Sequence, residues 1–149
     1  MSKRGWFLPL LTALLLGACG SDSTGPSEVN LDGAWTLSAT NVSGQGVSCN
    51  LGPTPATINQ SGSTFTGNYG PGTVTCLAGT ESVSFPVQGT IVSGTISGNS
   101  VQFNLDTQDL HLAGSRSGNS MSGTVQWTID FGGDIGVVTL SGNWAAAKQ

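Results

Sequence analysis

Charged side chains are scarce in this sequence, which has four Lys or Arg, eight Asp or Glu and one His among its 149 residues. So low a charged fraction excludes a long charged helix or a coiled coil. The shortage of basic residues argues against a nucleic-acid partner, because such binding depends on dense Lys and Arg contacts with phosphates. The net charge of −4 likewise provides no electrostatic attraction to an anionic lipid surface.

Residues that carry acid–base chemistry are few as well. His111 is the single histidine, and it alternates with Leu110 and Leu112, so we expect it to point outward from a strand. The sequence has no Gly-x-Ser-x-Gly pattern for a nucleophile on a strained turn. We therefore expect a protein that is not an enzyme and that needs no cofactor.

Four carboxylates fall into two loose pairs, Asp106 with Asp109 and Asp130 with Asp134, both at expected strand ends. Neither pair has the alternating Asp/Asn spacing of a dedicated calcium loop. We interpret them as solvated turn residues and predict no metal site.

The N-terminal segment has the pattern of an export signal. Lys3 and Arg4 precede a nearly continuous apolar run, 6–16, which is shorter than the roughly 20 residues that span a bilayer. The string Leu16-Gly17-Ala18-Cys19 that follows resembles the lipobox of bacterial lipoproteins. An ordinary signal peptide is the alternative, but it would give the cysteine no role.

The lipobox resemblance implies that residues 1–18 are a signal peptide and that Cys19 is acylated at its thiol and becomes the mature N-terminus. The acyl chains on Cys19 would then be the contact with the membrane. Gly20 stands where lipoproteins retained in the inner membrane typically carry Asp, which favours the outer membrane of the cell envelope. Residues 19–30 lack periodicity and are predicted to be a flexible tether.

From residue 31 onward the apolar residues repeat with a period of two. Val125, Trp127 and Ile129 share one parity, while Thr124 and Gln126 share the other, which is typical of a half-buried strand. Turn sequences such as Ser97-Gly98-Asn99-Ser100 separate the strands and suit tight antiparallel hairpins. The pattern predicts strands near 32–40, 55–60, 63–69, 73–77, 86–97, 100–106, 109–115, 120–130 and 136–146, with 73–77 the least regular and 86–97 bent or split at Gly94.

Residues 31–149 are therefore predicted to form one all-β domain, an antiparallel up-and-down meander closed into a small barrel of about eight strands. A β-sandwich is the alternative. A transmembrane barrel would show the same alternation with its faces exchanged, but several expected strands are shorter than the roughly nine to eleven residues that a bilayer needs.

The segment Gly33-Ala34-Trp35 on the first expected strand resembles the Gly-x-Trp motif of the calycins, the lipocalin and avidin-like barrels. In those proteins the tryptophan packs across the closed end, and in lipocalins a basic residue after the last strand commonly covers it. Lys148 is the residue that this resemblance would place there. The resemblance also implies binding of a small hydrophobic ligand.

Two cysteines remain once Cys19 is assigned to lipid, namely Cys49 and Cys76. An even number in an exported protein predicts a disulfide, with two buried free thiols as the alternative. The stretch from Gly44 to Pro55 lacks apolar periodicity, so a bridge to a later strand would tie it to the barrel.

Large aromatic residues recur in the expected strands, and the candidates for an apolar interior are Trp35, Phe65, Phe103, Trp127 and Trp144. They form either a solid core or the wall of a ligand cavity. Exposed tryptophans on a sugar-binding face are a third possibility. We expect a lipid-anchored, non-catalytic envelope protein that binds a small hydrophobic ligand. The alternative is an interaction or scaffold lipoprotein that contacts a protein or polysaccharide through its polar outer face.

Overall fold

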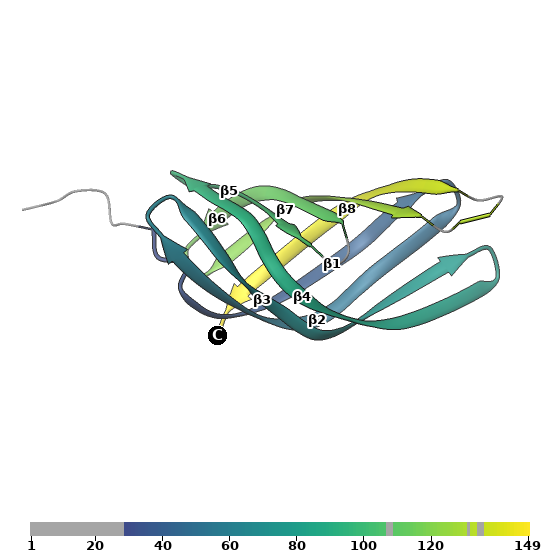
Figure 1. Ribbon diagram of the computed structural model, residues 1–149, viewed down its shortest axis with the longest axis horizontal. Coiled ribbons are helices and arrows are strands. Elements are labelled where there is room, and N and C mark those ends of the chain that lie inside the picture. The colour runs from purple at the N-terminus through teal and green to yellow at the C-terminus, as the bar shows by residue number, and fades with distance from the viewer. Residues whose placement is uncertain (1–28, 107–108, 131, 134–135) are drawn as a thin grey trace, which may run out of the picture.

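The protein is a closed antiparallel β-barrel (Figure 1). The computed structural model describes residues 29–106, 109–130, 132–133 and 136–149. Each strand pairs with the next in the chain, and the last pairs with the first. The strands are β1 (Gly33–Gly44), β2 (Val47–Ser61), β3 (Thr64–Ala78), β4 (Glu81–Ser97), β5 (Ser100–Leu105), β6 (Leu110–Ser117), β7 (Ser120–Asp130) and β8 (Val137–Lys148). The predicted eight-stranded meander is confirmed, and it closes as a barrel and not as a sandwich.

Apolar side chains point into the barrel and polar side chains point outward, because successive residues of a strand face opposite sides. On β7, Val125 and Trp127 are buried, whereas Thr124 and Gln126 are exposed. The same separation of faces runs round the barrel. The five aromatic residues expected inside, Trp35, Phe65, Phe103, Trp127 and Trp144, are all at most 4% exposed.

Aromatic rings fill the middle of the barrel. Phe103 makes edge-to-face contacts on two sides, with Phe65 at 5.7 Å and with Trp144 at 5.2 Å between ring centroids. The indole N–H of Trp144 donates to the carbonyl of Ala113 at 3.1 Å, so this buried polar group is satisfied. Gly123 pairs with Trp144, and a Cβ at Gly123 would lie only 2.0 Å from the Ala113 carbonyl oxygen. The backbones of β6 and β7 are therefore so close at this position that a glycine is required.

The expected strands 63–69 and 73–77 are a single strand, β3, which corrects the sequence interpretation. In the sequence, Gly70, Pro71 and Gly72 interrupt the alternation of apolar and polar residues. The β2–β3 ladder skips this region, with Leu51 paired to Val74 on one side and Ala56 paired to Tyr69 on the other. A proline is tolerated where the ladder is already interrupted, so pairing on both sides continues the strand.

The stretch from Gly44 to Pro55 was also misinterpreted, because it contains the end of β1, a turn and the first half of β2. Cys49 and Leu51 face inward there and are buried. Pro53 and Pro55, at the end of this stretch, hide its short alternation of apolar and polar residues. Thr54 fills the interruption opposite Gly72, where a Cβ would lie 2.1 Å from the Thr54 hydroxyl oxygen.

The strand β4 is irregular near Gly94, as the sequence predicted, but it does not split. Its pairing with β5 shifts between Val92 and Thr95, and Ser93 has a φ of 54°. A Cβ at Gly94 would lie 2.5 Å from a ring carbon of Phe65. The bulge therefore brings the β4 backbone against the aromatic core.

Candidate ligand-binding site

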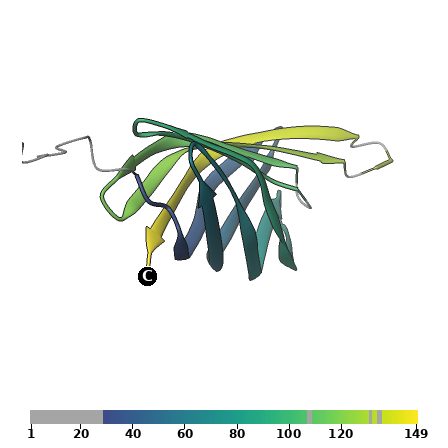
Figure 2. The same ribbon diagram turned by 60° about the vertical axis from the view of Figure 1, so that its left-hand side comes forward.

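The two ends of the barrel differ, and we call them the sealed end and the open end. The chain enters β1 and leaves β8 at the sealed end, whereas the β1–β2, β3–β4 and β7–β8 turns belong to the open end. Figures 1 and 2 show the β7–β8 hairpin and the C-terminus at opposite ends of the molecule.

Trp35 and Leu31 close the sealed end from inside. Leu31 is fully buried and Trp35 is 1% exposed, and the Trp35 indole N–H donates to the Leu31 carbonyl at 2.7 Å. The side chain of Gln60 holds the entering chain in place. Its carbonyl oxygen accepts from the Leu31 N–H and its amide nitrogen donates to the Val29 carbonyl, both at 2.7 Å.

The wall of the barrel is incomplete at the open end because its strands differ in length. The six-residue strand β5 pairs with β4 only from Ile91 to Ser97, so the first part of β4 extends beyond it. Asp106 ends this pairing, since its carboxylate accepts from the backbone N–H of Thr90 at 3.0 Å. On the other side, β6 begins opposite Trp127, and Ile129 extends past it. Among the described residues, this leaves a lateral opening between β4 and β7.

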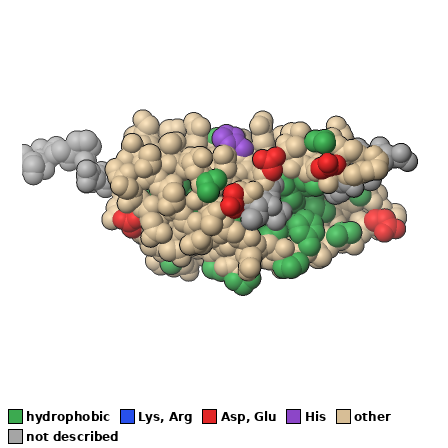
Figure 3. Space-filling model, viewed as in Figure 1, with side chains coloured by type: hydrophobic (Ala, Val, Ile, Leu, Met, Phe, Trp, Pro, Cys, Tyr) green, Lys and Arg blue, Asp and Glu red, His purple; other side chains and the backbone are tan. Residues whose placement is uncertain are grey.

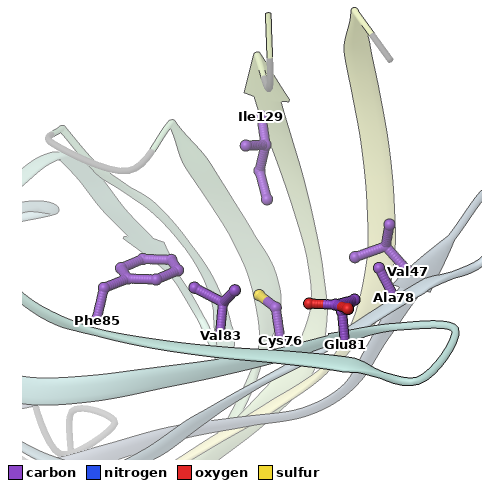
Figure 4. Close-up of a pocket in the computed structure, with 7 residues that line it drawn as sticks. All are labelled: Val47, Cys76, Ala78, Glu81, Val83, Phe85 and Ile129. Carbon is purple, nitrogen blue, oxygen red and sulfur yellow. The ribbon is translucent and has the colours of Figure 1, made fainter. Parts of the chain in front are cut away.

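An apolar pocket with a volume of about 250 Å³ occupies this opening. Figure 3 shows hydrophobic side chains gathered in the right-hand half of the same face, between the β3–β4 and β7–β8 ends. The pocket is lined by Val47, Cys76, Ala78, Glu81, Val83, Phe85 and Ile129 (Figure 4). An apolar cavity of about 150 Å³ binds benzene, and drug-sized ligands occupy about 300 to 1,000 Å³, so the volume here suits a compact molecule between those sizes.

The pocket brings β7 together with three consecutive strands, β2, β3 and β4, that are separated from it in the sequence by β5 and β6. Figure 4 shows Ile129 of β7 facing the β4 side chains Phe85 and Val83 across the cavity, with Cys76 of β3 beside Val83 and Val47 of β2 at the far right. Val83 is 57% exposed although it lines the apolar cavity. A ligand that covered it would remove apolar surface from water, which is favourable by about 25 cal/mol per Å².

Among the described residues, Glu81 is the one charged residue that lines the pocket. It is exposed and pairs with Ala78 at the β3–β4 turn, so its carboxylate lies at the rim of the pocket. The part of the lining that the structure describes thus offers van der Waals contact over most of its area and one anionic group at its edge.

Cys49 and Cys76 form a disulfide beside the pocket. The two residues pair directly across β2 and β3, with a Cα–Cα distance of 4.0 Å. Cys49 is buried, and the sulfur of Cys76 points into the cavity (Figure 4). The bridge therefore joins the two strands at the base of the pocket.

Trp127 lies next to the pocket lining and is almost completely buried. Its ring is 6.3 Å from that of Phe85, centroid to centroid, with the planes tilted by 52°. Trp127 therefore supports the Phe85 side of the pocket. The other four expected interior aromatics, Trp35, Phe65, Phe103 and Trp144, do not line it. The three described tryptophans are all buried, so they form no exposed sugar-binding face.

The remaining sequence candidates lie elsewhere. Cys19 and Asp134 are outside the described residues. His111 is exposed, and its Nδ1 lies 2.6 Å from the Asn104 side-chain oxygen. The Asp130 carboxylate accepts from the backbone N–H of Gly132 at 2.8 Å, which is the local bond of a turn residue. Within the described part of the chain, no three His, Cys, Asp or Glu residues are grouped to hold a metal ion.

Three of the pocket residues, Glu81, Val83 and Phe85, precede the strand expected at 86–97, whereas β4 begins at Glu81. A usable signal was present in Val83, Phe85 and Val87, which alternate with Ser82 and Ser84. Pro86 lies in the part of β4 beyond β5, where a missing backbone N–H is tolerated on an open edge.

No family model, curated protein or solved structure matches this chain. Among the described residues, no helix has the length and apolar character needed to cross a membrane.

Proposed function

We propose that this protein is a lipid-anchored, non-catalytic binding protein of the cell envelope, which takes a small hydrophobic molecule into the pocket at its open end. The observation that carries the proposal is the apolar cavity of about 250 Å³ at the open end of a barrel whose other end is closed. The described lining residues are mostly apolar, with one carboxylate at the rim, which is the polarity of a binding site for an apolar molecule.

The resemblance to calycins supports the same proposal. Trp35 follows Gly33 at the closed end, and the ammonium of Lys148 lies 5.8 Å from the centre of the Trp35 ring. Lys148 is the last residue of β8 and not a residue beyond it, a small difference from the arrangement that the resemblance implied. The interior differs more, because aromatic rings fill its middle and the apolar pocket lies near the open end.

Anchoring through acylated Cys19, in the outer membrane, is part of the proposal and rests on the lipobox resemblance. The described chain begins at the sealed end, where Val29 is held by Gln60. An anchor preceding this residue would attach to the end opposite the pocket. The open end would then be free to meet a ligand.

Binding is tested with cyclohexylmethanol, a neutral molecule smaller than the pocket, added to the full-length protein in phospholipid nanodiscs. We expect saturable binding by calorimetry, after subtraction of empty nanodiscs, and a change in tryptophan emission because Trp127 lies beside the lining. Ala78→Trp places a large ring in the pocket and should abolish binding. Leu77→Trp is the matched control, because Leu77 lies outside the lining and is 49% exposed.

Absence of saturable binding, or equal loss in both variants, would contradict a binding pocket at this site. An interaction or scaffold lipoprotein that uses its polar outer face would then be the better interpretation.

A further inference from the structure

The described charges are separated along the barrel. Four of the five described carboxylates, Glu81, Asp106, Asp109 and Asp130, are at strand ends or turns of the open end. The two described cations, Arg116 and Lys148, are near the sealed end, since Arg116 precedes the β6–β7 turn and Lys148 ends β8. The apolar pocket is therefore at the anionic end of the molecule, and Figure 3 shows acidic side chains around the hydrophobic patch.

From this arrangement we propose that the pocket selects a compact hydrophobic amine, a molecule with an apolar body and one cationic nitrogen. This inference rests on the proposed function and specifies its ligand class. The apolar lining accepts the body, and the Glu81 carboxylate at the rim attracts the cation. An anionic lipid such as a fatty acid would bring a second negative charge to the same rim and is disfavoured.

Phe85 lies four residues from Glu81 along β4, and Val83 and Cys76 lie between the two side chains in Figure 4. The ring of Phe85 is part of the cavity wall opposite Ile129 (Figure 4). The ring would therefore contact the apolar body of the ligand, while the cationic nitrogen lies beside the Glu81 carboxylate. A carboxylate ligand would meet no favourable charge at this rim.

Three probes of nearly equal size separate charge from hydrophobicity: cyclohexylmethylamine, cyclohexylmethanol and cyclohexanecarboxylate. They are titrated into the full-length protein in neutral phospholipid nanodiscs at low ionic strength. Because Glu81 is exposed, its attraction is modest. We expect the amine to bind about threefold more tightly than the alcohol and the carboxylate to bind several-fold more weakly than the alcohol. High salt should reduce these differences, because it screens exposed charges.

Glu81→Gln removes the rim charge and keeps the side-chain length, so it should bring the amine and alcohol affinities together. The matched control is Asp32→Asn, which removes one negative charge at the sealed end, where Asp32 accepts from the Gln60 backbone N–H. It should leave the order of the three probes unchanged. Partition of each probe into the nanodisc lipid is the same for the wild type, Glu81→Gln and Asp32→Asn. It therefore cancels when the affinities of the three proteins for one probe are compared.

The outcomes distinguish this inference from the proposed function. If all three probes bind wild type equally, or if the carboxylate binds most tightly, selection for an amine is wrong although the pocket still binds apolar molecules. If Asp32→Asn reduces the preference as much as Glu81→Gln does, the preference reflects net charge and not the pocket rim, and the assignment to Glu81 is overturned. If none of the probes binds, the proposed function fails together with the inference.

Discussion

The ammonium of Lys148 lies 5.8 Å from the centre of the Trp35 ring, although the two residues are at opposite ends of the barrel sequence. Both strands reach the sealed end, because β1 begins there and β8 finishes there, and Trp35 pairs with Lys148 in the ladder that closes the barrel. The same ammonium donates to the Asn30 carbonyl at 3.3 Å. One side chain thus contacts the closing tryptophan and the segment that leads into β1.

Trp35 and Lys148 should contribute very differently to stability. Trp35→Ala removes a fully buried ring and should lower the free energy of unfolding by about 3 to 5 kcal/mol. Lys148→Ala removes a cation over the ring at a partly exposed position and should cost about 0.5 to 1 kcal/mol. Chemical denaturation measures both, and Lys148→Arg, which keeps a cation, should be milder. Equal losses for Trp35→Ala and Lys148→Ala would contradict this account.

Neighbouring residues on β7 provide a test of which face is inside. Trp127→Ala should lower the free energy of unfolding by about 3 to 5 kcal/mol, because Trp127 is 4% exposed and packs on Phe85. Gln126→Ala should change it by no more than about 0.5 kcal/mol, because Gln126 is exposed. Thermal melts of the two variants provide the comparison. An unchanged melting temperature for Trp127→Ala would show that this ring is not part of the packed core.

Removal of the disulfide should lower the free energy of unfolding. Cys49 and Cys76 are 27 residues apart, and closing such a loop stabilises a fold by about 3.5 kcal/mol in the chain-entropy model. The double variant Cys49→Ala, Cys76→Ala should therefore unfold at lower denaturant concentration by a corresponding amount. Peptide mapping without reductant should recover the two cysteines as one linked pair. Recovery of two free thiols would show that Cys49 and Cys76 are not linked.

The anchor is tested by Cys19→Ser, which removes the thiol that the lipobox chemistry requires. The protein should then leave the membrane fraction, whereas the unmodified chain should stay there after a salt wash, because its attachment would be hydrophobic. Gly20→Ala is a control that keeps the thiol. A Cys19→Ser protein that still sediments with salt-washed membranes would mean that something other than acyl chains holds it.

Local patterns in the sequence predicted the barrel but not its pocket. Val125 and Trp127 alternate with polar neighbours, and short turns centred on residues such as Gly98 require a positive φ, so strands and hairpins are readable from a few adjacent residues. The pocket depends instead on β5 being shorter than β4, and on Val83 and Ile129 facing each other across the cavity that this difference leaves. No local window contains both residues, and their positions on opposite sides of the cavity follow only from the register of the closed sheet.

Prolines are the other reason why part of the fold could not be predicted from the sequence. Pro55 and Pro71 lower the strand propensity of their segments, but the β2–β3 ladder continues on both sides of them. Pairing across the sheet outweighs local propensity there, which is the usual context dependence of strand formation. The part of β2 that carries Cys49 was obscured for this reason.

Because the barrel has an even number of antiparallel strands, β1 begins and β8 ends at the same end of it. This has a practical consequence for handling the protein. The backbone N–H of Gln149 donates to the Ala34 carbonyl at 2.9 Å, so the C-terminal residue is fixed beside the start of β1 at the sealed end. An affinity tag fused after Gln149 would therefore project from the face opposite the pocket. Immobilised by such a tag on a sensor surface, the barrel would present its opening to the flowing solution.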